Sequence, residues 1–281
     1  MEKSKIRSLY LYVGLAYLIT WFFWITAFLL GYKDIAFMNI LSWDFNNQSS
    51  VISFLIFRLG VYGPLISSFV ITYYFFKLEG IRDLWQRITK WKVELKWYLY
   101  MLLIPILINL AVVLIGVIIG IPFNSFFKSE LPLSIILIYF LYQIFTSGME
   151  EPGWRGFLLE KLQKIYTAEI SSWILGLIWA VWHYPYLLFL YSNLNLISII
   201  FSVVGFTMAI IGQTFIITWF YNNTKSVLIT ILLHAWLNTS TTYILGNITI
   251  TNPVMGVIPA LVTWGIVFIL LKKYGGKTLT S

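Results

Sequence analysis

Long apolar runs separated by short polar segments dominate the pattern of this 281-residue chain. A helix needs about 20 apolar residues to cross the hydrocarbon core of a bilayer. Eight stretches reach this length, and the Trp and Tyr residues near their ends are typical of membrane interfaces. The pattern therefore predicts an all-α, polytopic membrane bundle of about eight transmembrane helices, at residues 9–30, 51–76, 97–120, 131–149, 169–191, 196–220, 226–245 and 254–271.

The composition supports this fold class, because 59% of the residues are hydrophobic and only 11% are charged. Soluble domains are nearer to one quarter charged. The length favours a single integral-membrane domain over residues 1–281, with its motif-bearing core at about 131–245. The chain has no cysteine, which excludes disulfides, zinc–thiolate sites and thiol nucleophiles.

The positive charges predict the topology. With the N-terminus placed in the cytoplasm, only Lys33, Lys128 and Arg58 of the 19 Lys and Arg residues fall outside the cytoplasmic segments. This bias predicts a multi-pass protein with both termini cytoplasmic. It also accounts for the net charge of +8 without nucleic acid. The abundance of Ile, Asn and Lys is consistent with a prokaryotic plasma-membrane protein. Arg58 lies inside the second span, where it can snorkel or pair with a carboxylate.

Residues 156–168 combine apolar Phe157, Leu158, Leu159, Leu162 and Ile165 with interspersed polar residues. This pattern predicts a short amphipathic helix lying on the cytoplasmic face of the membrane.

Two carboxylates and a guanidinium follow directly on the fourth apolar stretch, as Glu150, Glu151 and Arg155. Ionisable groups at membrane depth are costly and are therefore candidates for a functional site. Pro152 predicts that the fourth helix ends or kinks beside them. Arg155 lies four residues after Glu151, so it can hold that carboxylate and leave Glu150 to take a proton from water. The alternative is a solvated acidic loop.

The only two histidines, His183 and His234, both lie within apolar segments. Trp179 shares a helix face with His183, and Asn238 shares one with His234. His234 and Asn238 can donate hydrogen bonds to one oxygen, as an oxyanion hole requires. The alternatives are an interfacial hydrogen bond for His183 and interhelical hydrogen bonding for the other pair.

Together, these motifs resemble the CPBP intramembrane endopeptidases. That family includes the type II CAAX prenyl endopeptidases and bacterial relatives linked to bacteriocin processing and self-immunity. The resemblance rests on Glu150-Glu151-x-x-x-Arg155, an aromatic residue before His183, and His234-x-x-x-Asn238, and more weakly on Tyr62-Gly-Pro64. The aromatic position is commonly Phe in the family, whereas this chain has Trp179.

The resemblance implies a glutamate-type protease that needs no metal. Glu150 would activate water with the help of His183, and His234 and Asn238 would stabilise the oxyanion. The supporting residues would be Glu151, Arg155 and Trp179. The substrate would be a peptide held at the membrane, of the prenylated CAAX type or the bacteriocin type. The lipid bilayer is the other expected partner, and nucleic acid is not expected.

Two other classes stay open at this point. The histidines and a carboxylate could bind zinc in an intramembrane metalloprotease, although the chain lacks a His-Glu-x-x-His motif. The same polar groups could instead belong to a transporter, or to a non-catalytic immunity or binding protein.

Overall fold

The computed structural model describes residues 2–33, 48–127, 132–246 and 253–280. The described residues form helices and connecting turns, with no β-strand among them, which confirms the predicted fold class. Lys128 and most of the loop after the first span lie outside these ranges. The long helices are α1 (Glu2–Leu29), α3 (Gln48–Val61), α4 (Gly63–Ile88), α5 (Leu95–Ile118), α11 (Leu196–Thr224), α12 (Val227–Leu245) and α13 (Pro253–Tyr274). The shorter helices are α6 (Ile136–Phe145), α7 (Glu151–Gly153), α8 (Glu160–Leu162), α9 (Ala168–Trp182) and α10 (Tyr184–Leu190).

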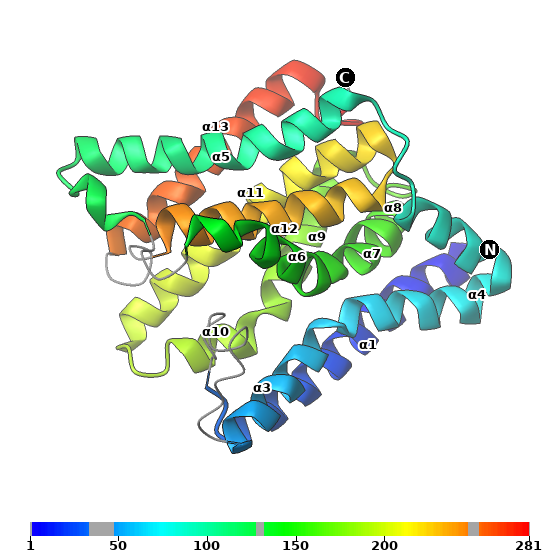
Figure 1. The fold of residues 1–281 in the computed structure, drawn as a ribbon. Coiled ribbons are helices and arrows are strands. Elements are labelled where there is room, and N and C mark those ends of the chain that lie inside the picture. Colours follow the sequence, from blue (N-terminus) through cyan, green and yellow to red (C-terminus); the bar gives the residue numbers. More distant parts are fainter. Residues whose placement is uncertain (1, 34–47, 128–131, 247–252, 281) are drawn as a thin grey trace.

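Six spans in the described residues are long and apolar enough to cross a membrane. Two further pairs, α3 with α4 and α9 with α10, are bent by 42° and 46°. The total is up to eight if each bent pair is one span, in the order that the sequence predicts. Both termini lie at the same end of the bundle, the N-terminus near α4 and the C-terminus near the start of α5 (Figure 1).

Both bends lie next to a proline, which cannot donate to the preceding helical turn. The first is at Tyr62, before Pro64, and the second is at His183, before Pro185. Side chains of α1 donate hydrogen bonds to carbonyl oxygens near the two bends: Thr20 to Gly60 (2.7 Å), Tyr17 to Ile178 (2.5 Å) and Trp21 to Trp182 (3.0 Å). The first helix therefore holds the two bent spans in place.

The fourth span is broken, but not at Pro152 as the sequence predicts. Glu151 keeps helical dihedral angles (φ −63°, ψ −34°), and Pro152 occupies the first turn of α7, where no amide hydrogen is needed. The chain leaves the helix at Thr146 instead (φ −110°, ψ −96°). The hydroxyls of Thr146 and Ser147 each bond a carbonyl four residues back, at 2.9 and 3.2 Å. Such bonds bend helices, and here they accompany the break.

The predicted amphipathic helix at residues 156–168 is also wrong. Residues 154–159 form a π-helix, and the helical segment ends with α8 at Leu162. Phe157, Leu158 and Leu159 are all buried, with at most 2% of their surface exposed. Apolar contacts therefore surround this segment inside the bundle, whereas a surface helix would expose one face. The polar residues of this segment lead to the prediction of a surface helix. In the structure they occur only in the last turn of the helical segment, and the turns before it are buried.

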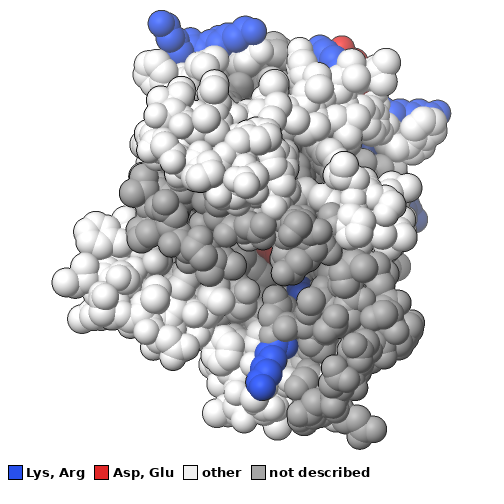
Figure 2. All heavy atoms as spheres, turned by 60° about the vertical axis from the view of Figure 1, so that its left-hand side comes forward, with Lys and Arg blue, Asp and Glu red and all other residues white. Residues whose placement is uncertain are grey.

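Much of the molecular surface is apolar. Many large apolar side chains are exposed, among them Leu29, Leu114 and Phe201, as expected for helices that face a bilayer. Figure 2 shows broad uncharged surfaces, with Lys and Arg concentrated toward one end, and an acidic side chain at the bottom of a hollow.

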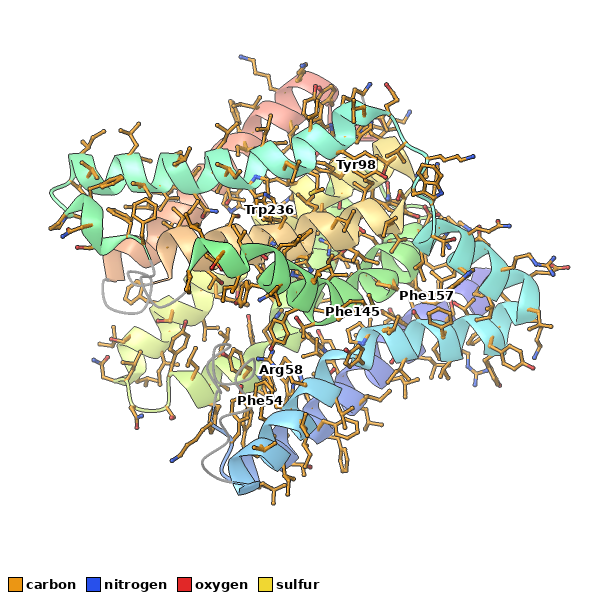
Figure 3. All side chains as sticks on the ribbon, in the orientation of Figure 1. Phe54, Arg58, Tyr98, Phe145, Phe157 and Trp236 are labelled. Carbon is orange, nitrogen blue, oxygen red and sulfur yellow. The ribbon has the colours of Figure 1, made fainter. Side chains whose placement is uncertain are left out.

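Polar side chains inside the bundle join helices to one another. Trp236 of α12 donates to the carbonyl oxygen of Leu102 on α5, at 2.9 Å (Figure 3). The Arg58 guanidinium carbon lies 4.7 Å from the centre of the Phe54 ring and 5.5 Å from that of Tyr142. These contacts stabilise a cation at membrane depth, and they tie α3 to α6.

Candidate active site

The predicted site residues come from three segments in the middle of the bundle: residues 150–155, the end of α9, and α12. Glu150 ends the 3₁₀ turn that follows the break, Glu151 begins α7, and Arg155 lies in the π-helix. Trp179 and His183 lie at the end of α9, and His234 and Asn238 lie on α12. A π-helical turn within an α-helical span is a frequent mark of functional sites.

Glu151 forms a buried ionic cluster with two partners. Its Oε1 atom accepts a hydrogen bond from Nη1 of Arg155 and one from Nδ1 of His234, each at 2.9 Å. The side chains of Glu151 and Arg155 are completely buried, and His234 is nearly so. The predicted pairing of Glu151 with Arg155 is confirmed. The carboxylate also fixes the ring of His234 and leaves its Nε2 atom available to a substrate.

Glu150 is buried as well, with 4% of its surface exposed, so the predicted alternative of a solvated acidic loop is wrong. Its Oε2 atom accepts hydrogen bonds from two indole nitrogens, Nε1 of Trp179 at 2.8 Å and Nε1 of Trp154 at 3.3 Å. Neither bond uses the second carboxylate oxygen. Two neutral donors therefore orient Glu150, while Arg155 binds its neighbour.

Trp179 contacts one carboxylate, both imidazoles and the guanidinium of the site. Besides its bond to Glu150, its ring centre lies 5.1 Å from that of His234 and 6.0 Å from that of His183. The Arg155 guanidinium carbon is 4.8 Å from the same ring. This aromatic side chain thus sets the spacing between the carboxylate and both imidazoles.

His183 lies at the bend between α9 and α10 and is half-buried. Its Nδ1 atom is 2.9 Å from the carbonyl oxygen of Trp179. A carbonyl oxygen can only accept, so Nδ1 carries the proton, and Nε2 is left as the acceptor in the neutral ring. Trp179 contacts both His183 and Glu150, and among the described contacts no direct hydrogen bond joins those two residues.

Asn238 follows His234 by one helical turn on the same face of α12. Its side chain is half-buried and forms no hydrogen bond to any described residue. The predicted alternative is an interhelical hydrogen bond from this amide, and no described contact supports it. An unengaged amide beside His234 is instead suited to bind a ligand oxygen.

A zinc site needs three or four donors that converge on one point. Within the described ranges, no three His, Asp or Glu side chains do so.

Two residues of the site were missed from the sequence. Trp154 bonds Glu150, and the spacing of four residues in a helical segment could have revealed it. Tyr12 of α1 is fully buried against the rings of Trp154 (6.0 Å) and Phe157 (4.7 Å), a long-range contact with no local signal. Pro64 matches a weaker predicted motif, and the nearby Tyr62 hydroxyl donates to the carbonyl of Phe145, just before the break.

The comparisons with known proteins identify the same region. Residues 132–240 match the family described as type II CAAX prenyl endopeptidase Rce1-like. The chain is related to this family. It is also 26% identical over 241 residues to the CAAX prenyl protease 2 of Methanococcus maripaludis, in an alignment that covers 81% of this chain and 82% of that protein.

The matched segment contains all seven residues predicted for the site, from Glu150 to Asn238. CAAX prenyl endopeptidases are proteases, and their substrates are associated with membranes. Together with the apolar spans, the relationship supports an integral membrane protein with a protease-like core.

Proposed function

We propose that this chain is an intramembrane endopeptidase that hydrolyses a peptide bond of a membrane-associated substrate by glutamate-activated water. One observation carries the proposal. A buried carboxylate, Glu150, is oriented by two indole donors beside two imidazoles that each have Nδ1 bound to the protein. This arrangement fixes the reactive groups before the substrate arrives, which lowers the reorganisation that catalysis requires.

In the first step, Glu150 takes a proton from water as the water oxygen attacks the peptide carbonyl carbon. The Nε2 atom of His183 accepts a hydrogen bond from the same water and orients it, and that second hydrogen stays on the attacking oxygen. In the second step, the carbon–nitrogen bond breaks and Glu150 returns its proton to the leaving amine. The products are a carboxylic acid and an amine, and the enzyme regains its starting state.

The tetrahedral intermediate carries an oxyanion, which His234 and Asn238 stabilise. Because Nδ1 of His234 donates to Glu151, donation from Nε2 requires a ring with both nitrogens protonated. In the resting enzyme, the negative charges of Glu150 and Glu151 are balanced by Arg155 and His234, and in the intermediate Glu150 is protonated and the oxyanion carries the charge instead. A neutral cluster of four charges suits a buried site.

The substrate class follows from the relatives and from the surroundings of the site. The Methanococcus protein is named a CAAX prenyl protease, so a prenylated C-terminal peptide is the first candidate, and a bacteriocin-type precursor is the second. The predicted topology, with both termini in the cytoplasm of a prokaryote, places the end of the bundle that holds α8 toward that compartment. No metal is required by this chemistry.

Replacing Asn238 by alanine tests the oxyanion assignment. The variant is expected to lower kcat about a hundredfold with little change in KM, because the amide acts on the transition state. Steady-state cleavage of a fluorogenic peptide in detergent micelles measures both constants.

The matched control is Asn109→Ala. Asn109 of α5 is a buried amide that bonds the carbonyl of Pro105 (2.9 Å) and the hydroxyl of Ser240 (3.0 Å), away from the site. Its loss is expected to lower thermal stability and to leave kcat of the folded fraction unchanged. Equal kcat losses in both variants would argue against an oxyanion role for Asn238.

A further inference from the structure

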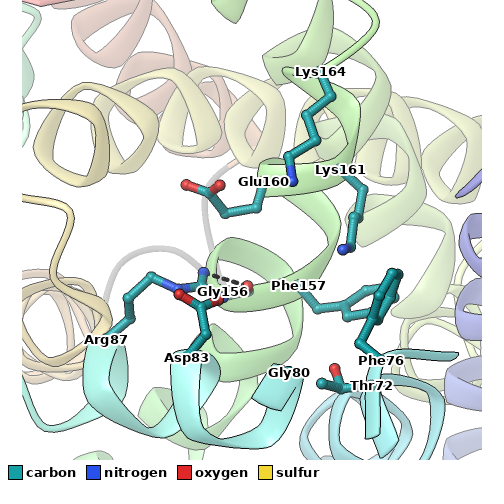
Figure 4. Close-up of a pocket in the computed structure, with 10 residues that line it drawn as sticks. All are labelled: Thr72, Phe76, Gly80, Asp83, Arg87, Gly156, Phe157, Glu160, Lys161 and Lys164. Carbon is teal, nitrogen blue, oxygen red and sulfur yellow. Dashed lines mark hydrogen bonds and ion pairs between the residues drawn. The ribbon is translucent and has the colours of Figure 1, made fainter. Parts of the chain in front are cut away.

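A second polar cavity lies apart from the candidate active site, between α4 and the segment that ends with α8. It has a volume of about 160 Å³ (Figure 4). Thr72, Phe76 and Phe157 form its apolar wall, and Arg87, Lys161 and Lys164 contribute basic groups. The two elements finish their spans here, so the cavity lies where a bilayer passes from hydrocarbon to head groups.

The acidic residues of the cavity are already neutralised. Asp83 accepts a hydrogen bond from Arg87 at 2.7 Å. Glu160 accepts one from the Tyr221 hydroxyl at 2.8 Å and lies 3.7 Å from the Lys225 ammonium. Because both carboxylates already have partners, the lysines of the cavity contribute positive charge that no carboxylate balances.

The ammonium groups of Lys161 and Lys164 form no hydrogen bond or ion pair with any described residue. Lys161 is half-buried, and its ammonium nitrogen lies 3.6 Å from the centre of the Phe76 ring. Figure 4 shows both lysines extending from the same helical segment, with the Lys161 ammonium directed toward the rings of Phe76 and Phe157. A partly desolvated ammonium without a carboxylate partner favours an anionic ligand.

The backbone of α4 is distorted beside this cavity. Lys77 has φ 55° and ψ −153°, a conformation that is unfavourable for a residue with a side chain. Lys77 lies between Phe76 and Gly80 in the sequence, and both of these residues line the cavity. A Cβ atom on Gly80 would lie 2.9 Å from the Thr72 methyl group, so glycine keeps this wall open. The distortion is thus a second feature that shapes the cavity.

We infer that this cavity binds the phosphate head group of an anionic phospholipid. The aromatic wall continues into the apolar surface of α4, where the exposed Tyr73 and Tyr74 can contact acyl chains. A ligand with an anionic head and an apolar tail matches both walls, as in other basic pockets between transmembrane helices. The bound lipid would join α4 to the helical segment that carries Arg155.

Native mass spectrometry of the detergent-purified full chain tests this inference. Phosphatidylglycerol is titrated onto the protein, with phosphatidylcholine as the uncharged comparison lipid. The double variant Lys161→Gln with Lys164→Gln is expected to bind phosphatidylglycerol about 30-fold more weakly than the wild type. Phosphatidylcholine binding is expected to stay unchanged.

The matched control is Lys272→Gln with Lys273→Gln, which removes the same charge from the exposed last turn of α13. It is expected to keep full lipid affinity, and Lys161→Arg with Lys164→Arg is expected to do so as well. Equal losses in both glutamine pairs would show diffuse attraction and overturn the proposed site. An unchanged affinity in the Lys161 and Lys164 pair would also overturn it. Displacement of the lipid by inorganic phosphate would assign the cavity to soluble phosphate.

Discussion

Replacing Glu150 by glutamine is expected to lower kcat by about 10²–10⁴-fold while the protein stays folded. The amide oxygen of glutamine can still accept the hydrogen bonds that Trp154 and Trp179 donate to Oε2. What is lost is the ability to take a proton from water. The loss should therefore appear in kcat, with KM within a few-fold of the wild type.

Glu79→Gln provides the same chemical change at an exposed position of α4. It is expected to leave kcat unchanged. Thermal unfolding of both variants in detergent separates a loss of chemistry from a loss of structure. A folded Glu150→Gln protein with wild-type kcat would refute the assignment of Glu150 as the base.

Replacing Arg155 by methionine is expected to lower the free energy of unfolding by about 3–5 kcal/mol. Arg155 and Glu151 are both completely buried, and their nitrogen and oxygen atoms are 2.9 Å apart. Removing the guanidinium leaves the carboxylate with only His234 to balance it. Desolvation of an uncompensated charge dominates this energy. Chemical unfolding in mixed micelles, followed by circular dichroism, measures the change.

The double variant Glu151→Gln with Arg155→Met removes both charges and is expected to recover much of that stability, because a neutral pair pays no ionic desolvation. Lys96→Met breaks an exposed pair with Glu94 and is the control, expected to have no measurable effect. Equal changes in the free energy of unfolding for the Arg155 and Lys96 variants would contradict a stabilising role of the buried ionic cluster.

The sequence predicts the spans and one key pair well, because both depend on local patterns. Apolar length gives the order of the helices, and a separation of four residues gives the bond between Glu151 and Arg155. Prolines also lie beside the two bent pairs, at Pro64 and Pro185, which the missing amide hydrogen of proline explains.

The rest of the site depends on contacts between distant segments. The helix before Glu150 ends at Thr146 and not at Pro152. Hydrogen bonds from hydroxyl groups to preceding carbonyl oxygens and the packing of Gly148 against Ile231 favour the break at this place. The π-helix buries residues whose pattern predicts a surface helix. Trp179 is predicted only as a supporting aromatic residue. Its bond to Glu150 joins residues 29 positions apart, which no periodicity encodes.

The assigned roles of Glu150, His183, His234 and Asn238 stay predictions, and so does independence from metal. The geometry favours them over the zinc alternative because, in the described ranges, no three His, Asp or Glu side chains converge on one point. A transporter or a non-catalytic immunity protein would need no oriented carboxylate beside unengaged donors such as Asn238.

The most direct measurement is cleavage by the purified wild-type protein of a farnesylated CAAX peptide and of a panel of bacteriocin-precursor peptides, with and without a metal chelator. The account predicts cleavage of at least one peptide at the same rate in both conditions, and no cleavage by Glu150→Gln. Cleavage that the chelator abolishes would contradict the glutamate mechanism and favour a metalloprotease. A failure to cleave any of the peptides would contradict the proposed activity on these substrate classes and favour a membrane binding or immunity protein.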